Sequence, residues 1–181
     1  MGGESSETAV GIALAEFNAL RAEIISHITA QTAVVTLGVT ALGILVGLVA
    51  KEGADDHLLL VVPPVSMFVI LLLTAENYRI WRIGDYIRNH LWPFLQAQAG
   101  PVPSWEAEVI RYRSSRGIFF KAAAIDSPAI ILFIVASVAS LAWIRDPGDG
   151  LWWAGCAMTA TAIGAPIAVA LSSRSNSLRP G

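Results

Sequence analysis

Four long apolar runs constrain this chain more than any other feature. They cover residues 31–50, 58–74, a third stretch ending at Ile144, and 151–171. Each is near the roughly 20 residues with which a helix crosses about 30 Å of hydrocarbon. The sequence therefore predicts an all-α protein with four transmembrane helices. In a chain of 181 residues, four such helices leave no room for a separate soluble domain.

The distribution of positive charge predicts how these helices are oriented. Of the twelve lysines and arginines, only Lys51 and Arg145 lie in the loops after the first and third runs. Because cytoplasmic loops carry the excess of Lys and Arg, we expect both termini and the long middle segment in the cytoplasm, with the protein in the inner (plasma) membrane. The N-terminus lacks a basic region and a cleavage site, so we expect no removable signal peptide.

The apolar and charged stretches together predict five segments. These are an amphipathic cytoplasmic helix leading into the first span (1–30), the first two spans (31–76), a basic helical hairpin in the cytoplasm (77–121), the last two spans (122–171) and a cytoplasmic tail (172–181). The formal net charge of −2 hides the basic hairpin, because residues 75–121 carry seven cations against four carboxylates. Arguments from charge therefore apply to this segment.

Helical periodicity predicts that the cytoplasmic segments continue the spanning helices. An N-terminal helix should begin near Thr8, with apolar and polar residues on different faces. The apolar face would hold Val10, Leu14, Phe17, Ile24, Ile25 and Ile28, and the polar face Glu16, Glu23 and His27. After the second span, a helix should end at Trp92 and Pro93, since proline opposes helix continuation, and a turn should cover 96–103. The apolar stripe of this helix after the second span is Ile80, Ile83, Ile87 and Leu91.

A stripe of small and hydroxyl residues runs along one face of the first span. It consists of Thr29, Thr32, Thr36, Thr40, Gly43 and Gly47, in steps of three or four. Such residues let helix backbones approach closely, within one subunit or between copies, and the last two form a G-x-x-x-G. In the alternative interpretation, Thr32, Thr36 and Thr40 line a polar path through an oligomer. Either interpretation fits a homo-oligomer.

Two further features near the spans have a structural and a functional interpretation. Either Ser127 or Asp126 would cap a helix whose first turn contains Pro128. Alternatively, Asp126 carboxylates from several subunits would form a cation-favouring ring in a pore. Pro63 and Pro64 predict either a kink in the second span or a helix that starts late.

Arginines and aromatic residues alternate along the cytoplasmic hairpin. Guanidinium groups suit phosphate and aromatic faces suit bases, which predicts a nucleotide or oligonucleotide ligand. The predicted ligand residues are Arg79, Arg82, Arg88, Arg111, Arg113, Arg116, Trp81, Tyr86 and Tyr112. Two alternatives stay open: contacts with interfacial and anionic lipid, and pairing of Arg82 and Arg88 with Asp85 three residues away.

Four motifs resemble a family of small, largely uncharacterised bacterial membrane proteins with four spans. In chain order they are EFNALRAEI at 16–24, VVPP at 61–64, YRIWRIGDYIR at 78–88 and SWEAE at 104–108. The likeness covers about residues 16–116 and implies no activity or catalytic residue. In architecture the chain also resembles membrane effectors of antiphage systems, including the Hailong type. That likeness implies an oligomeric channel controlled by a cytoplasmic nucleotidyltransferase partner.

These observations predict a gated channel or membrane-perturbing effector that an anionic ligand controls from the cytoplasm. The competing class is a membrane anchor or scaffold that recruits a soluble partner, with its basic segment on anionic lipid. We expect no enzyme, because no nucleophile, base and orienting group stand at a recognisable spacing. We expect no cofactor or metal either, since Glu23 and His27 offer only two ligands on one face. The single Cys156 lies in the fourth run, which excludes a disulfide framework.

Overall fold

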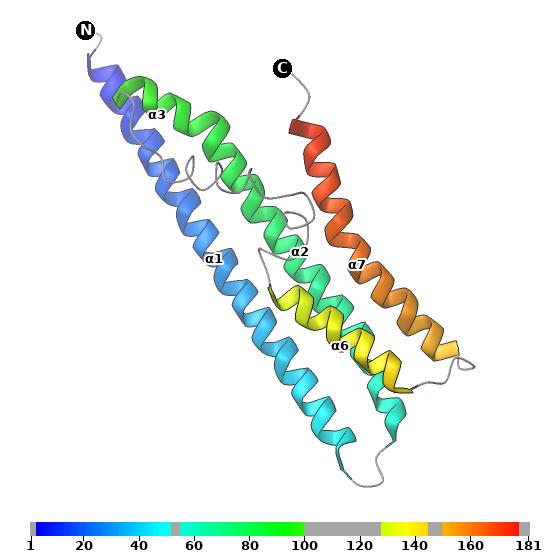
Figure 1. Cartoon of the computed structure of the whole chain (residues 1–181). Helices are drawn as coiled ribbons and strands as arrows, with labels where there is room; N and C mark the ends of the chain where they lie inside the picture. The colour runs from blue at the N-terminus through cyan, green and yellow to red at the C-terminus, as the bar shows by residue number, and fades with distance from the viewer. Residues whose placement is uncertain (1–2, 52–54, 100–127, 145–149, 178–181) are drawn as a thin grey trace. The chain divides into compact units, whose positions relative to one another are not determined.

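The computed structural model describes residues 3–51, 55–99, 128–144 and 150–177, and every element in them is helical (Figure 1). The elements are α1 (Gly3–Val49), the 3-10 helix η1 (Asp56–Val61), α2 (Val62–Tyr86), the π-helical turn η2 (Ile87–Leu91), α3 (Trp92–Ala99), α6 (Pro128–Ile144) and α7 (Gly150–Ser177). The predicted all-α class is confirmed.

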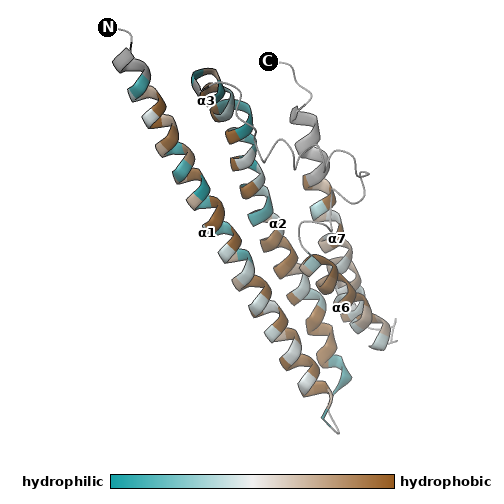
Figure 2. Cartoon of the chain, turned by 60° about the vertical axis from the view of Figure 1, so that its left-hand side comes forward, coloured by the Kyte–Doolittle hydropathy of each residue, from teal (hydrophilic) through white to brown (hydrophobic). Residues whose placement is uncertain are grey.

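Three helical segments are long and apolar enough to cross a membrane. They are Glu7–Val49, Asp56–Gln98 and Gly150–Val169. The third predicted span is α6, which is apolar but shorter, at 17 residues. Figure 2 shows hydrophobic residues along α6 and the first half of α2. In the second half of α2, toward α3, hydrophilic residues are mixed with them. The three long apolar helices indicate a multi-pass membrane protein.

The ends of two helices differ in how well they match the sequence-based predictions. α1 begins at Gly3, so the predicted start near Thr8 is wrong. No proline lies between these positions, and nothing there obliges a helix to begin late. In α2, Pro63 and Pro64 occupy the first turn, where proline costs no intrahelical hydrogen bond. The α-helix thus starts at Val62, and the 3-10 helix η1 precedes it directly.

The helix does not end at Trp92 and Pro93, so that prediction is wrong. The π-helical turn Ile87–Leu91 joins α2 to α3, and the Trp92 N–H donates to the carbonyl of Ile87, five residues earlier. A π turn widens the helix locally, and it ends two positions before Pro93, which cannot donate to the helical ladder. The chain stays helical to Ala99, which also removes the first part of the turn predicted over 96–103.

The chain divides into two compact units, each of which has its own packed residues. Unit 1 is Met1–Ala30 with Glu76–Arg116, and unit 2 is Gln31–Ala75 with Gly117–Gly181. In unit 1, Ile87 and Leu91 of the predicted apolar stripe are buried, as is Ala13. The core of unit 2 joins α2, α6 and α7. Its buried residues are Val69, Ile70, Leu73, Ile130, Phe133 and Ala162.

A row of buried and partly buried residues runs along α1 at alternating steps of four and three. In unit 1 they are Ala13, Phe17, Leu20, Ile24 and His27, and in unit 2 they are Gln31, Val34, Gly38, Ala41 and Leu45. We call this row the α1 seam. It has the 3.5-residue repeat of helices that pack along their length. The predicted apolar face of the N-terminal helix is wrong in part: Leu14, Ile25 and Ile28 are exposed, whereas the polar His27 lies in the seam.

Candidate functional site

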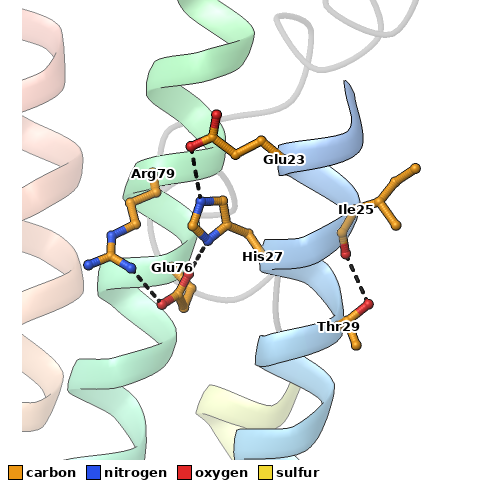
Figure 3. Close-up of polar contacts among 6 residues, drawn as sticks. All are labelled: Glu23, Ile25, His27, Thr29, Glu76 and Arg79. Carbon is orange, nitrogen blue, oxygen red and sulfur yellow. Dashed lines mark hydrogen bonds and ion pairs between the residues drawn. The ribbon is translucent and has the colours of Figure 1, made fainter. Parts of the chain in front are cut away.

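Four charged or titratable side chains of unit 1 meet where α1 packs on the second half of α2. Nδ1 of His27 lies 2.6 Å from Oε2 of Glu76, and Nε2 of the same ring lies 3.7 Å from Oε1 of Glu23. The second oxygen of Glu76 accepts a hydrogen bond from Arg79 at 3.1 Å. We call Glu23, His27, Glu76 and Arg79 the His27 cluster, and Figure 3 shows the imidazole between the two carboxylates.

Burial makes the contact between His27 and Glu76 the strongest of this cluster. Their side chains are 18% and 17% exposed, whereas Glu23 and Arg79 are 56% and 61% exposed. A hydrogen bond to a charged group contributes more than a neutral one, and exposed ion pairs contribute little. The His27 cluster therefore links α1 to α2 chiefly through one short contact.

Further contacts in unit 1 join α1 to the end of α2 and to α3. The Tyr86 hydroxyl donates to Oε1 of Glu16 at 2.8 Å. Phe17 packs on Trp92 with ring centroids 6.4 Å apart, and the Arg21 guanidinium lies 5.7 Å from the Phe17 ring centre. The polar face of the N-terminal helix is thus part of a helix contact.

Carboxylates of the chain itself engage three of the predicted ligand residues. Arg79 pairs with Glu76, and Tyr86 bonds to Glu16. Arg88 lies 3.9 Å from Asp85, which is the intrahelical pairing that the sequence offered as an alternative. Asp85 also accepts a hydrogen bond from Asn89 at 3.0 Å.

The remaining predicted ligand residues with a described structure lie on the surface of α2. Trp81 and Arg82 are exposed, and the Trp81 ring stacks on Tyr78 with centroids 6.3 Å apart and planes 22° apart. Spacings of three and four residues place Tyr78, Trp81 and Arg82 on one helical face. We call these three residues the aromatic-arginine face.

Several predicted site residues lie outside the described part of the chain. They are Arg111, Tyr112, Arg113 and Arg116 of the ligand set, and Asp126 of the pore set. Their roles stay predictions.

The predicted pore-lining threonines lie on the exposed side of α1. Thr36 donates to the carbonyl of Thr32 at 2.9 Å, and Thr40 donates to that of Thr36 at 2.8 Å. A Cβ added at Gly43 or Gly47 would meet no atom within 4 Å. The small-residue stripe is therefore not a close contact between the described helices of this chain.

Close approach between helices of unit 2 instead occurs at two glycines that the sequence did not single out. A Cβ at Gly38 would lie 2.5 Å from Cζ of Phe133, and one at Gly155 would lie 2.8 Å from Cδ2 of Leu141. Gly38 lies in the α1 seam, but burial in the structure defines that row, and the exposed apolar Leu37 stands next to it, so the local sequence holds no signal that selects Gly38. Within the part of the chain that the structure describes, no group of three or more His, Cys, Asp and Glu side chains is arranged to hold a metal ion.

Comparison with known proteins adds no functional information. No protein-family model, curated protein or solved structure matches this chain. Functional inference therefore depends on the residues and contacts given above.

Proposed function

We propose that this chain is an oligomeric membrane channel or membrane-perturbing effector, with four transmembrane helices and both termini in the cytoplasm. An anionic ligand, a nucleotide or oligonucleotide, would control it from the cytoplasmic side. The observation that carries the proposal is an exposed face of α1 on which Thr32, Thr36, Thr40, Gly43 and Gly47 lie together.

This face lies opposite the α1 seam. Thr36 and Gly38, for example, are two positions apart, which is about 200° around a helix. The chain uses the seam for its own packing and leaves the threonine-glycine face exposed. Hydroxyls that bond to their own helix can face lipid or protein without loss of a hydrogen bond, and glycines favour a second helix over lipid. Several copies around an axis would turn these faces into a hydroxyl-lined path.

Ion flux into liposomes tests the conduit. We expect the reconstituted protein to pass monovalent ions, and Thr36→Leu or Thr40→Leu to reduce the flux several-fold by narrowing the path and removing its hydroxyls. Val39→Leu adds an apolar group beside the stripe and is the matched control, with flux near that of the wild type. Absence of flux from wild-type oligomers, with and without oligonucleotide, would contradict the channel.

Labelling of single cysteines tests the orientation. In a Cys156→Ala background, a cysteine at Asp55 should react with an impermeant reagent outside intact cells, because the loop after the first span contains a single Lys and no Arg. A cysteine at Gln98 should react only after the membrane is permeabilised, because it belongs to the basic segment that the positive-inside rule places in the cytoplasm. Reaction of the cysteine at Gln98 in intact cells would contradict the proposed orientation, because it would place the basic segment outside the cell.

Binding of single-stranded oligonucleotide tests the ligand. The exposed aromatic-arginine face offers bases a stacking surface and phosphate a cation, and Arg111, Arg113 and Arg116 supply further charge in the same hairpin. We expect a triple Arg→Gln change at these three positions to weaken binding at least tenfold and to flatten its salt dependence, because fewer counterions are released. Unchanged affinity in the triple variant would remove these arginines from the site.

A membrane anchor or scaffold is the second candidate, and one observation favours it. Glu76, Asp85 and Glu16 engage Arg79, Arg88 and Tyr86, which reduces what these residues can offer to a ligand. The aromatic-arginine face would then contact lipid headgroups. Binding to anionic vesicles without oligonucleotide binding or ion flux would select this candidate. A role in antiphage defence and a nucleotidyltransferase partner rest on the resemblance in architecture alone.

A further inference from the structure

Three helices of unit 2 meet at a tight apolar contact near the start of α2. A Cβ added at Gly155 of α7 would lie 2.8 Å from Leu141 of α6 and 3.4 Å from Pro63 of α2. The indole N–H of Trp152 donates to the Leu141 carbonyl at 3.1 Å and so joins α6 to α7 at the same end. Pro63, Leu141 and Gly155 therefore lie at one level of the bundle.

A second apolar level lies about two turns away along the same helices. The core there contains Val69 of α2, Phe133 of α6 and Ala162 of α7. Residue numbers rise from the first level to the second in α2 and α7 and fall in α6. α2 and α7 therefore run in one direction, and α6 runs in the other. Residues one turn from the first level lie between the two apolar levels.

All three helices carry a buried hydroxyl at this intermediate level. The residues are Ser66 in α2, Ser137 in α6 and Thr159 in α7, at 0%, 2% and 7% exposure. They stand three or four residues from the first level, and we call them the hydroxyl layer. Apolar residues lie on either side of it, so the layer is a polar region enclosed in an apolar core.

Two hydroxyls of this layer have no partner among the residues that the structure describes. Thr159 donates to the carbonyl of Gly155 at 2.9 Å, but neither Ser66 Oγ nor Ser137 Oγ makes a hydrogen bond to a described residue. A buried hydroxyl without a partner costs about 1–3 kcal/mol. Such groups in native proteins are usually satisfied by ordered water, which needs two to four polar partners. Ser66, Ser137 and Thr159 supply that number.

We infer that the hydroxyl layer is an internal hydration site, in which bound water bridges Ser66 and Ser137. A neutral ligand fits better than an ion, because α2 up to Ala75, α6 and the first twenty residues of α7 contain no Asp, Glu, Lys or Arg that could balance a charge. Water can donate and accept, as hydroxyls do, and it is small enough for a densely packed core.

Thermal unfolding of the full-length protein in detergent micelles tests this site. Ser66→Ala and Ser137→Ala should each lower the Tm by about 2–4 °C, because each removes one partner of the bridging water. The double variant should fall no further than either single variant, since the bridge is already lost. Ser140→Ala is the control for a buried serine outside the bridge, as its hydroxyl bonds to the Ser137 carbonyl at 2.8 Å. Its effect should add to that of Ser66→Ala.

A dry site predicts the opposite sign. If the two hydroxyls are only buried and unpaired, or turn to bond their own helices, each Ser→Ala change should leave the Tm unchanged or raise it, and the two effects should add. That result would overturn the hydration site. A second measurement is independent of stability: magnetisation transfer from water in the lipid-reconstituted protein should reach the Ser66 and Ser137 amides faster than those of Val69 and Phe133. Equal, slow transfer at all four would also overturn it.

Discussion

Gly38→Ala should destabilise unit 2, although it adds a single methyl group. The new Cβ would lie 2.5 Å from Cζ and 2.9 Å from Cε1 of Phe133, and 3.0 Å from Cγ2 of Val69. Phe133 is fully buried in the core of unit 2, so its ring cannot swing aside without displacing its neighbours. Overpacking of this kind costs about 1–3 kcal/mol. The measurement is the midpoint of thermal unfolding in detergent, which should fall by several degrees.

Gly43→Ala is the matched control on the same helix. A Cβ there meets nothing within 4 Å, and alanine stabilises a helix interior over glycine by about 0.5–1 kcal/mol. This variant should therefore be as stable as the wild type or more stable. Combining Gly38→Ala with Phe133→Leu should recover part of the loss, because the shorter side chain vacates the volume that the methyl group needs. Equal midpoints for the two alanine variants would show that α1 does not pack on Phe133.

The contrast between these two glycines shows what the sequence could predict about packing. The G-x-x-x-G of Gly43 and Gly47 indicates that a backbone can approach, but it does not say what approaches it. The contact of Gly38 depends on where α6 places Phe133, which is 95 positions later in the chain. The residues around Gly38 in the sequence therefore do not reveal this contact. The repeat of four and three in α1 is a repeat of burial, and exposed apolar residues such as Ile12, Leu37 and Ile44 lie outside it, so the sequence of this helix alone does not mark its packed side.

Apolar length predicted the helices, and local chemistry did not always predict their ends. The bounds of α6 and the late start of α2 follow from apolar composition and from the tolerance of prolines in a first turn. The continuation through Pro93 does not follow, because it depends on a π turn whose cost the surrounding packing must offset.

The candidate site was predicted less well than the fold. Its residue types were recognised, but an arginine's spacing from a carboxylate does not reveal whether a second helix also supplies a partner. In the sequence, Glu76 is one of the four carboxylates in the basic segment 75–121, yet in the structure it binds His27, which is 49 positions away. Contacts at that separation follow from the packing of α1 on α2, and single-helix periodicity cannot determine them.

Removing the Glu76 carboxylate should loosen the attachment of α1 to α2 within unit 1. Glu76→Ala deletes the acceptor of both His27 and Arg79 and leaves a largely buried imidazole without its closest partner. Loss of a hydrogen bond to a charged group costs about 1.5–3 kcal/mol. Glu76→Gln keeps an acceptor oxygen but loses the charge, so its effect should lie between the alanine variant and the wild type. Hydrogen exchange of the backbone amides around His27 and Glu76 should accelerate in the same order.

Two comparisons separate this contact from a general effect of charge. Asp85→Asn removes a carboxylate from the same helix, but its arginine contact is 3.9 Å long and exposed, so exchange around His27 should stay at the wild-type rate. In a double-mutant cycle, the loss of unfolding free energy in the His27→Ala, Glu76→Ala double variant should be smaller than the sum of the losses in the two single variants. The reason is that either change alone breaks the shared contact. Additive costs, or acceleration by Asp85→Asn equal to that of Glu76→Ala, would mean that Glu76 acts through the net charge of the segment. In that case the His27 cluster would not join the two helices.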